Sequence, residues 1–258
     1  MKFPPSIRAW RLLAAVLAAV CLSTMPCAAA DLLVWSAGAA RPPLDELVPE
    51  FHKMSKKVLQ VEYAPVGVLM RRLAEGTLPD VLIVSTEVVA EVERKGWSVP
   101  GSALALGSVG VGVAVKDGAP LPDISSPDAL RKTLLAARSI TYMDPQKGTS
   151  GKHFAAVLEQ LGIAEQVKAR TTLGDVGFVV EPVARGEIEL GVQQITEILP
   201  VKGARLLGPL PAPLQKITTY SVMLGAQARD PLLAGALIGY LTGAQAAAMF
   251  RQKGFSVP

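Results

Sequence analysis

Short apolar runs alternate with amphipathic segments along most of the chain. The apolar runs have the length and composition of buried strands; they lie at 32–38, 58–64, 80–85, 137–143, 190–195 and 205–210. The first amphipathic segment, 42–54, places Leu44, Leu47, Val48 and Phe51 at i, i+3, i+4 and i+7, which predicts a helix with one buried face. Further helices are predicted at 68–75, 87–95, from Ser150 onward, 231–242 and 244–252. Strands that alternate with helices favour an α/β protein with mostly parallel sheets.

Two longer extended runs, 107–115 and 216–224, interrupt this alternation and enclose a complete α/β block. A chain that leaves one lobe, builds a second and returns needs two such connecting strands. We therefore expect two lobes joined by two hinge strands. The predicted boundaries are 31–110 with 218–258 for lobe 1, and 111–217 for lobe 2.

The first 30 residues have the features of a secretory signal peptide. Lys2, Arg8 and Arg11 precede an apolar run, and Ala28 to Ala30 offer the small residues of a cleavage site before Asp31. The run is too short to cross a bilayer, which takes roughly 20 apolar residues. We predict a periplasmic protein that is not inserted in the membrane once residues 1–30 are removed.

Removal of the signal also changes the chemistry of the chain. Both cysteines lie within it, and it holds three of the 26 basic residues and none of the 22 acidic ones, so the formal net charge falls from +4 to +1. A nearly neutral chain without a basic cluster gives no reason to expect nucleic-acid binding. No cysteine remains and the two histidines, His52 and His153, are isolated, so we expect neither a metal nor a cofactor.

Small and hydroxyl residues follow the predicted strands, where a parallel sheet binds its ligands. They are Ser36, Ala37, Gly38 and Ala39 after the first strand, Val66 and Gly67 after the second, Ser85 after the third, and Gly148, Thr149, Ser150 and Gly151 after the fourth. The helices that begin there present unpaired N–H groups and the positive end of the helix dipole. We predict an anion site made of these helix starts. The alternative is that Thr149 or Ser150 only caps its helix.

Two further groups of residues favour a ligand richer in hydrogen-bonding groups. Gln193, Gln194 and Thr196 end the strand at 190–195, and glutamine both donates and accepts hydrogen bonds. Arg41, just after the first loop, has the planar fork that suits a carboxylate. The alternatives are a solvated turn for the glutamines and a surface position for the arginine.

Four stretches resemble the molybdate-binding branch of type II periplasmic solute-binding proteins: LLVWSAGAARPPLDELVPEF, RRLAEGTLPDVLIVSTEVVAEVERKGW, VARGEIELGVQQITEI and GALIGYLTGAQAAAMFRQKGF. The resemblance covers nearly all of the mature chain and implies two α/β lobes that close on an anion. In that family serines, backbone N–H groups and a tyrosine hold the oxyanion. Ser36 matches the first serine, whereas Ala64 to Gly67 replace the second and Gln194 stands at the tyrosine position.

The resemblance implies a monomeric protein that captures a small anion, a molybdate-like oxyanion or a small multi-carboxylate, for an ABC permease. The same group resembles periplasmic aconitate isomerase, which interconverts the cis and trans forms of a tricarboxylate by proton transfer. For that alternative the candidate acid–base residues are His153, Glu197 and Glu181. From the sequence, binding is the leading hypothesis and isomerisation the alternative.

Overall fold

The computed structural model describes residues 30–257. The predicted signal peptide lies outside the described residues apart from Ala30. Residues 31–257 belong to one compact unit. In the described part of this unit, nine strands form a curled sheet with the order β2-β1-β3-β9-β4-β7-β5-β6, and β8 pairs with β4. The strands are β1 (Leu32–Ala37), β2 (Leu59–Ala64), β3 (Val81–Ser85), β4 (Leu104–Lys116), β5 (Ile140–Met143), β6 (Thr171–Gly174), β7 (Leu190–Gln194), β8 (Ala204–Pro209) and β9 (Ile217–Leu224).

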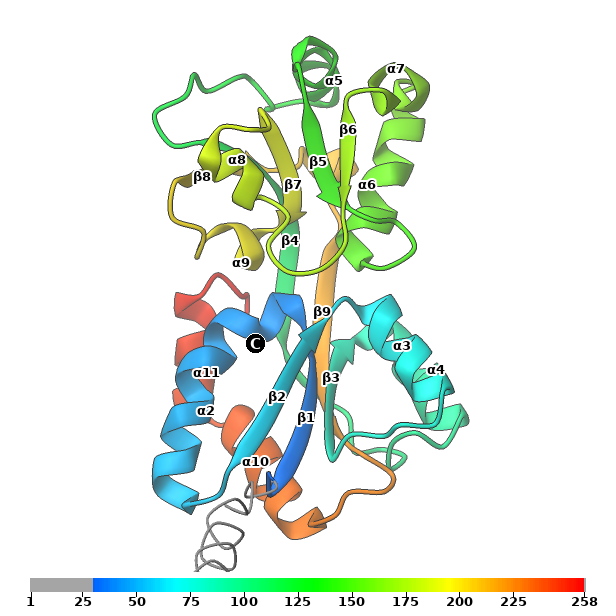
Figure 1. Ribbon diagram of the computed structural model, residues 1–258, viewed down its shortest axis with the longest axis vertical. Coiled ribbons are helices and arrows are strands. Elements are labelled where there is room, and N and C mark those ends of the chain that lie inside the picture. The colour runs from blue at the N-terminus through cyan, green and yellow to red at the C-terminus, as the bar shows by residue number, and fades with distance from the viewer. Residues whose placement is uncertain (1–29, 258) are drawn as a thin grey trace, which may run out of the picture. The chain divides into compact units, whose positions relative to one another are not determined.

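In each α/β block, helices cover both faces of the sheet (Figure 1). The α-helices are α2 (Arg41–Ser55), α3 (Val66–Ala74), α4 (Val89–Arg94), α5 (Pro127–Ala136), α6 (Thr149–Gln160), α7 (Ala164–Lys168), α8 (Glu181–Arg185), α9 (Ile195–Ile198), α10 (Pro231–Leu241) and α11 (Ala244–Gln252). Short 3₁₀ helices lie at Gly38–Ala40, Thr86–Val88 and Ala212–Leu214. Among the described residues no single helix is long and apolar enough to cross a membrane; only α10 and α11 reach that length and composition, as a pair bent by 57°.

The first α/β block is built around β1, which pairs in parallel with β2 and β3. Both faces of β3 are buried, as its continuous run of apolar residues requires when helices lie on both sides. The buried face of α2 carries Leu44, Leu47 and Phe51, three of the four positions that the sequence pattern assigns to it. One hydrophobic cluster joins these residues to α10 and α11 from the end of the chain.

The second block repeats this arrangement around β5, which pairs in parallel with β6 and β7. Its apolar residues form two further clusters, which draw on β4, β5, β7 and α6. Phe154 of α6 is fully buried and contacts the ring of Tyr142 edge-on, with 5.1 Å between the ring centroids.

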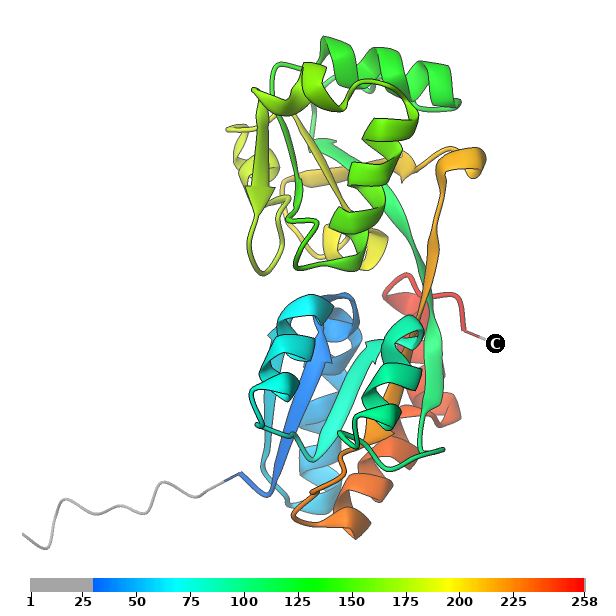
Figure 2. The same cartoon turned by 90° about the vertical axis from the view of Figure 1, so that its right-hand side faces the viewer.

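Two long strands connect the blocks. β4 pairs with β9 from Leu104 to Gly110, and with β7 and β8 from Val111 onward, so one strand belongs to both halves of the sheet. β9 runs antiparallel to β4 and pairs with β3 at its other edge. Figure 2 shows β4 and β9 side by side between the blocks. These strands are the two extended runs of the sequence, and their arrangement confirms the predicted two-lobed fold with two hinge strands.

Candidate functional site

A cavity of about 220 Å³ lies where the two α/β blocks face each other. At roughly 30 Å³ per liquid water, this volume holds about seven waters, enough for a small organic anion. Its walls come from the ends of β1 and β2, the starts of α3 and α6, the loop before α8, α9 and β9. The lining residues are Ala37, Gly38, Ala39, Arg41, Tyr63, Ala64, Pro65, Val66, Met143, Gly148, Thr149, Ser150, Val176, Gly177, Phe178, Glu197 and Tyr220.

The helix starts that the sequence analysis grouped together reach the cavity from both blocks. The 3₁₀ turn at Gly38–Ala40 leads directly into α2, α3 begins at Val66, and α6 begins at Thr149. First-turn N–H groups have no partner within their own helix and can donate to an anion. α6 offers its hydroxyls as well, because Thr149 and Ser150 both line the cavity.

Of the predicted ligand-binding residues, eight line the cavity: Ala37, Gly38, Ala39, Arg41, Val66, Gly148, Thr149 and Ser150. The others do not: Ser36, Gly67, Ser85, Gly151, Gln193, Gln194 and Thr196. Ser36 is buried within the sheet and its hydroxyl donates to the carbonyl oxygen of Ala37 at 3.1 Å. Strand alternation accounts for this, since Ser36 and Ala37 face opposite sides of β1.

Two of the glycines in this group serve close packing instead. A Cβ atom on Gly151 would lie 1.9 Å from the carbonyl oxygen of Met143, so only glycine allows α6 to lie against the end of β5. Gly67 donates its N–H to the carbonyl oxygen of Lys147 at 2.8 Å. That bond joins α3 of the first block to the loop of the second, and it occupies the donor that the sequence analysis assigned to a ligand.

Of the three acid–base candidates, Glu197 is the one that lines the cavity. His153 lies on α6 with Nε2 2.7 Å from the carbonyl oxygen of Leu214, and Glu181 is exposed on α8. Glu197 is buried, with 7% of the residue exposed. Burial raises the pKa of the Glu197 carboxyl to about 8, against the opposing effect of a hydrogen bond from Gln193.

Glu197 also lies against the other block. A Cβ atom on Gly38 would be 2.5 Å from Glu197 Oε1, so the glycine gives the carboxyl room beside the start of α2. Near neutral pH a carboxyl with this pKa is present in both its protonated and its ionised form. Such a group can both give and take a proton in the cavity.

Tyr220, on the hinge strand β9, lines the cavity but was not selected in the sequence analysis. Its hydroxyl oxygen accepts a hydrogen bond from Gln194 Nε2 at 3.2 Å and lies 3.4 Å from Thr149 Oγ1. Burial raises the pKa of Tyr220, with Glu197 acting in the same direction, so the phenol keeps its proton. The phenol can therefore donate a hydrogen bond into the cavity. Gln194 does not line the cavity and acts on it through this bond.

Arg41 lines the cavity and lies close to two aromatic rings. Its guanidinium carbon is 5.3 Å from the ring centroid of Tyr63 and 5.2 Å from that of Phe178. Its Nε donates to Asp45 Oδ2 at 3.3 Å, and Tyr63 donates its hydroxyl proton to Asp45 Oδ1 at 2.8 Å. Burial raises the pKa of Tyr63, and the bond to Asp45 adds to the effect, so this donor also stays protonated.

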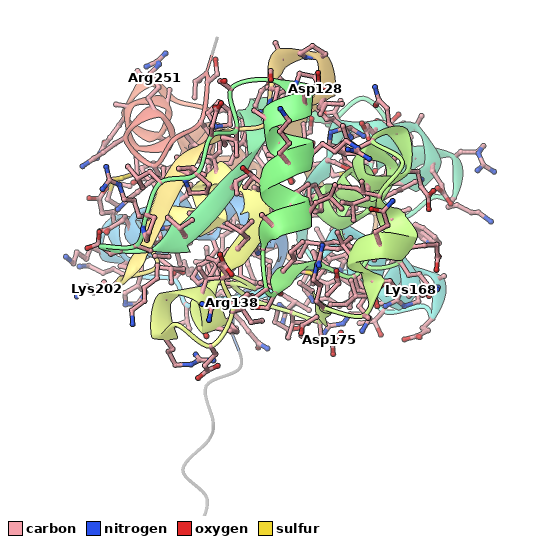
Figure 3. All side chains as sticks on the ribbon, turned by 90° about the horizontal axis from the view of Figure 1, so that it is seen from above. Asp128, Arg138, Lys168, Asp175, Lys202 and Arg251 are labelled. Carbon is pink, nitrogen blue, oxygen red and sulfur yellow. The ribbon has the colours of Figure 1, made fainter. Side chains whose placement is uncertain are left out.

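Most of the other charged side chains that the structure describes lie away from the cavity, and Asp80 is buried elsewhere. Charged side chains such as Lys168 and Lys202 lie at the periphery in a view from above (Figure 3). Within residues 30–257, no group of three or more histidine, cysteine, aspartate or glutamate side chains is placed to hold a metal ion. The cavity thus combines one buried carboxyl with neutral donors and a single guanidinium.

Residues 32–256 match the model of a protein family described as bacterial extracellular solute-binding protein. The chain belongs to this family. The solute-binding protein described here is also 32% identical to a curated aconitate isomerase from Pseudomonas sp over 254 residues, which cover 95% of this chain and 96% of the relative.

Solved structures agree with this family in fold. The periplasmic molybdate-binding protein of Azotobacter vinelandii superimposes with a TM-score of 0.74 at 18% identity, covering 88% of this chain and 99% of that one. The sulfate-binding protein of Mycobacterium tuberculosis H37Rv has a TM-score of 0.67 at 16% identity, with 87% and 85% of the two chains covered. The predicted resemblance to the molybdate-binding branch of type II solute-binding proteins, and with it the two-lobed α/β fold, is confirmed.

Proposed function

We propose that this solute-binding protein is an isomerase that moves a proton along a small unsaturated tricarboxylate of the aconitate type. The observation that carries the proposal is the buried carboxyl of Glu197 in a cavity otherwise suited to an anion. The ionised form of this carboxyl would repel a bound anion, so a site that only captures an anion gains nothing from a group that ionises near neutral pH. The relationship to an aconitate isomerase over nearly the full length of both chains supports this assignment.

The reaction needs only a group that accepts and returns a proton. The ionised Glu197 carboxyl takes a proton from the methylene carbon of the substrate, and the electron pair of that C–H bond spreads over the allylic carbons and the adjoining carboxylates. Glu197 then returns the proton to the far allylic carbon, which moves the double bond and lets its geometry change. Atoms and charge balance without an oxidant, a reductant or a cofactor.

The other residues of the cavity stabilise the extra negative charge of the intermediate. The first-turn N–H groups of α6, the hydroxyl of Thr149 and the phenol of Tyr220 are donors fixed in place before the reaction. Arg41, which lines the cavity, binds a carboxylate of the substrate. His153 and Glu181 lie outside the cavity wall, and we assign them no part in the proton transfer.

The test is turnover of trans-aconitate by the purified mature protein, followed by chromatographic separation of the cis and trans acids. Glu197→Gln keeps the size of the side chain and removes the base, so we expect turnover to fall by roughly 100-fold or more. Glu181→Gln, an exposed glutamate of the same block, is the matched control and should retain wild-type turnover. Wild-type protein that fails to interconvert the two acids at high concentration would falsify the proposal.

A second function is favoured by the fold and the family. In this function the cavity binds a small anion without changing it, and the protein delivers the anion to an ABC permease. This is the leading hypothesis of the sequence analysis. Binding of molybdate or sulfate in preference to tricarboxylates, measured by calorimetry, would support this function and exclude the isomerase.

We further propose that the protein acts as a monomer in the periplasm, with the lobe boundaries given by the sequence analysis. The separate hydrophobic clusters support these boundaries. The buried residues of one cluster lie within 32–109 and 220–255, and those of the others lie within 111–214.

A further inference from the structure

We propose that Tyr63, Phe178 and Asp45 hold Arg41 as a clamp for one carboxylate of the substrate, and that this clamp is complete only when the two lobes are closed. The inference rests on the proposed tricarboxylate substrate and adds a specificity-determining device to it. Arg41 is the residue that touches the ligand, and the other three position it.

The contacts of Arg41 leave one direction open for a ligand. The Tyr63 and Phe178 rings lie 5.3 and 5.2 Å from the guanidinium carbon and within cation–π range. Asp45 accepts from Nε and is the one carboxylate that pairs with Arg41 among the described residues. The two terminal nitrogens of the fork therefore remain for the cavity that Arg41 lines. Two parallel N–H groups in one plane match the two oxygens of a carboxylate.

Asp45 is itself held in place, which fixes the guanidinium further. One of its oxygens accepts from Arg41 and the other accepts the hydroxyl proton of Tyr63 at 2.8 Å. Asp45 and Arg41 are four residues apart on α2 and so lie on the same helix face. A long side chain that is already ordered loses less conformational entropy when it binds a ligand.

The clamp draws on both lobes. The first α/β block supplies Arg41 and Asp45 from α2 and Tyr63 from β2. Phe178 lies between β6 and α8 of the second block and packs against a hydrophobic cluster of that block. The bond from the Gly67 N–H to the Lys147 carbonyl crosses between the same blocks. Separation of the lobes would remove Phe178 from Arg41, so carboxylate binding at Arg41 favours the closed form.

Binding of tricarballylate, a saturated tricarboxylate that cannot undergo the reaction, tests the clamp by calorimetry. Loss of a charge-assisted bidentate contact in Arg41→Gln should weaken binding by roughly tenfold or more. Arg72→Gln is a matched control: Arg72 lies 5.6 Å from the Trp35 ring centroid, pairs with Glu62 and has a similarly exposed side chain (40%, against 42% for Arg41), but it does not line the cavity. This control should bind as the wild type does.

Phe178 is tested by replacement and rescue. Phe178→Leu removes the ring and should weaken binding by roughly threefold, the worth of one cation–π contact, whereas Phe178→Trp keeps a ring and should restore it. A role in packing alone would change the melting temperature without this dependence on a ring. Equal affinity of wild type and Arg41→Gln for tricarballylate overturns the clamp.

The outcomes separate the clamp from the proposed function. Suppose that the wild type binds tricarballylate but does not isomerise trans-aconitate, and that Arg41→Gln binds tricarballylate more weakly. This result supports the clamp and rejects the isomerase. Normal affinity and normal turnover in Arg41→Gln reject the clamp and leave the isomerase in place. A wild-type protein that binds no tricarboxylate rejects both.

Discussion

Replacement of the buried Glu197 by glutamine should make the unliganded protein more stable at neutral pH. Burial raises the pKa of this carboxyl from 4.5 to about 8. A carboxyl whose folded-state pKa lies above its unfolded value must take up a proton on folding at any pH between the two. Its contribution to stability is therefore fully present below about pH 4.5 and is lost as the pH rises towards about 8.

The size of the effect follows from the pKa difference. Each pKa unit corresponds to about 1.36 kcal/mol. At pH 7 the carboxyl ionises readily in the unfolded state but not in the folded state, which lowers the free energy of unfolding by about 3 kcal/mol. The amide of Glu197→Gln carries no charge and avoids this cost. The free energy of unfolding of the variant should thus exceed that of the wild type by about 3 kcal/mol at pH 7 and by almost nothing at about pH 4.5.

Urea unfolding followed by tryptophan fluorescence, at several pH values between about 5 and 8 and without ligand, measures this difference. Glu181→Gln removes a carboxyl that is exposed to solvent, so its free energy of unfolding should follow that of the wild type. A Glu197→Gln variant with no gain at pH 7, or with a gain that does not change with pH, would refute the reasoning. The same substitution is expected to lower turnover by roughly 100-fold or more, so the site would trade stability for activity.

Three further predictions test the cavity and its frame. Gly67→Ala places a Cβ atom 2.8 Å from the Lys147 carbonyl oxygen of the other block. Separation of the blocks relieves this clash, so the substitution should weaken tricarballylate binding while leaving the melting temperature near that of the wild type. Gly239→Ala, which meets no atom within 4 Å, is the control. Thr149→Val removes a cavity hydroxyl and should weaken ligand binding by roughly fivefold, and equal affinity would mean that Thr149 only supports the helix start. Asp80→Asn should lower the free energy of unfolding in urea by about 2–3 kcal/mol. The buried Asp80 carboxylate accepts hydrogen bonds of 2.6 Å from Leu33 N, Arg229 N and the Arg229 guanidinium. A loss below about 1 kcal/mol would contradict this role.

Most of the secondary structure could be predicted because long elements carry many periodic positions. The helix at 41–55 and the strands of the first block differ from the predicted ranges only at their ends. The short elements α7, α8, α9 and β6 offer too few residues for a period to be recognised. α5 was also missed, although its start carried a usable signal: Ser126 caps it by accepting from Ala129 N, and Pro127 occupies its first turn.

The candidate site was harder to predict because it depends on orientation. The sequence indicates which strand ends gather at one edge, but the choice between Ser36 and Ala37 depends on which face of β1 meets the cavity. Tyr63 and Phe178 come from different blocks and carry no motif that links them to Arg41. Only the packing of the two lobes brings these three side chains together.

Glu197 illustrates how a small change in chain direction alters the chemistry of an anion site. β7 ends at Gln194 and α9 begins at the next residue, so the chain turns inward and brings a carboxyl to a wall that helix starts and hydroxyls otherwise share. Burial favours the neutral form of Glu197, and the hydrogen bond from Gln193 favours the ionised form. A carboxyl poised between these influences can exist in either state near neutral pH, as an acid–base group must. With an apolar residue at position 197, the same cavity would bind an anion but would have no proton acceptor in its wall.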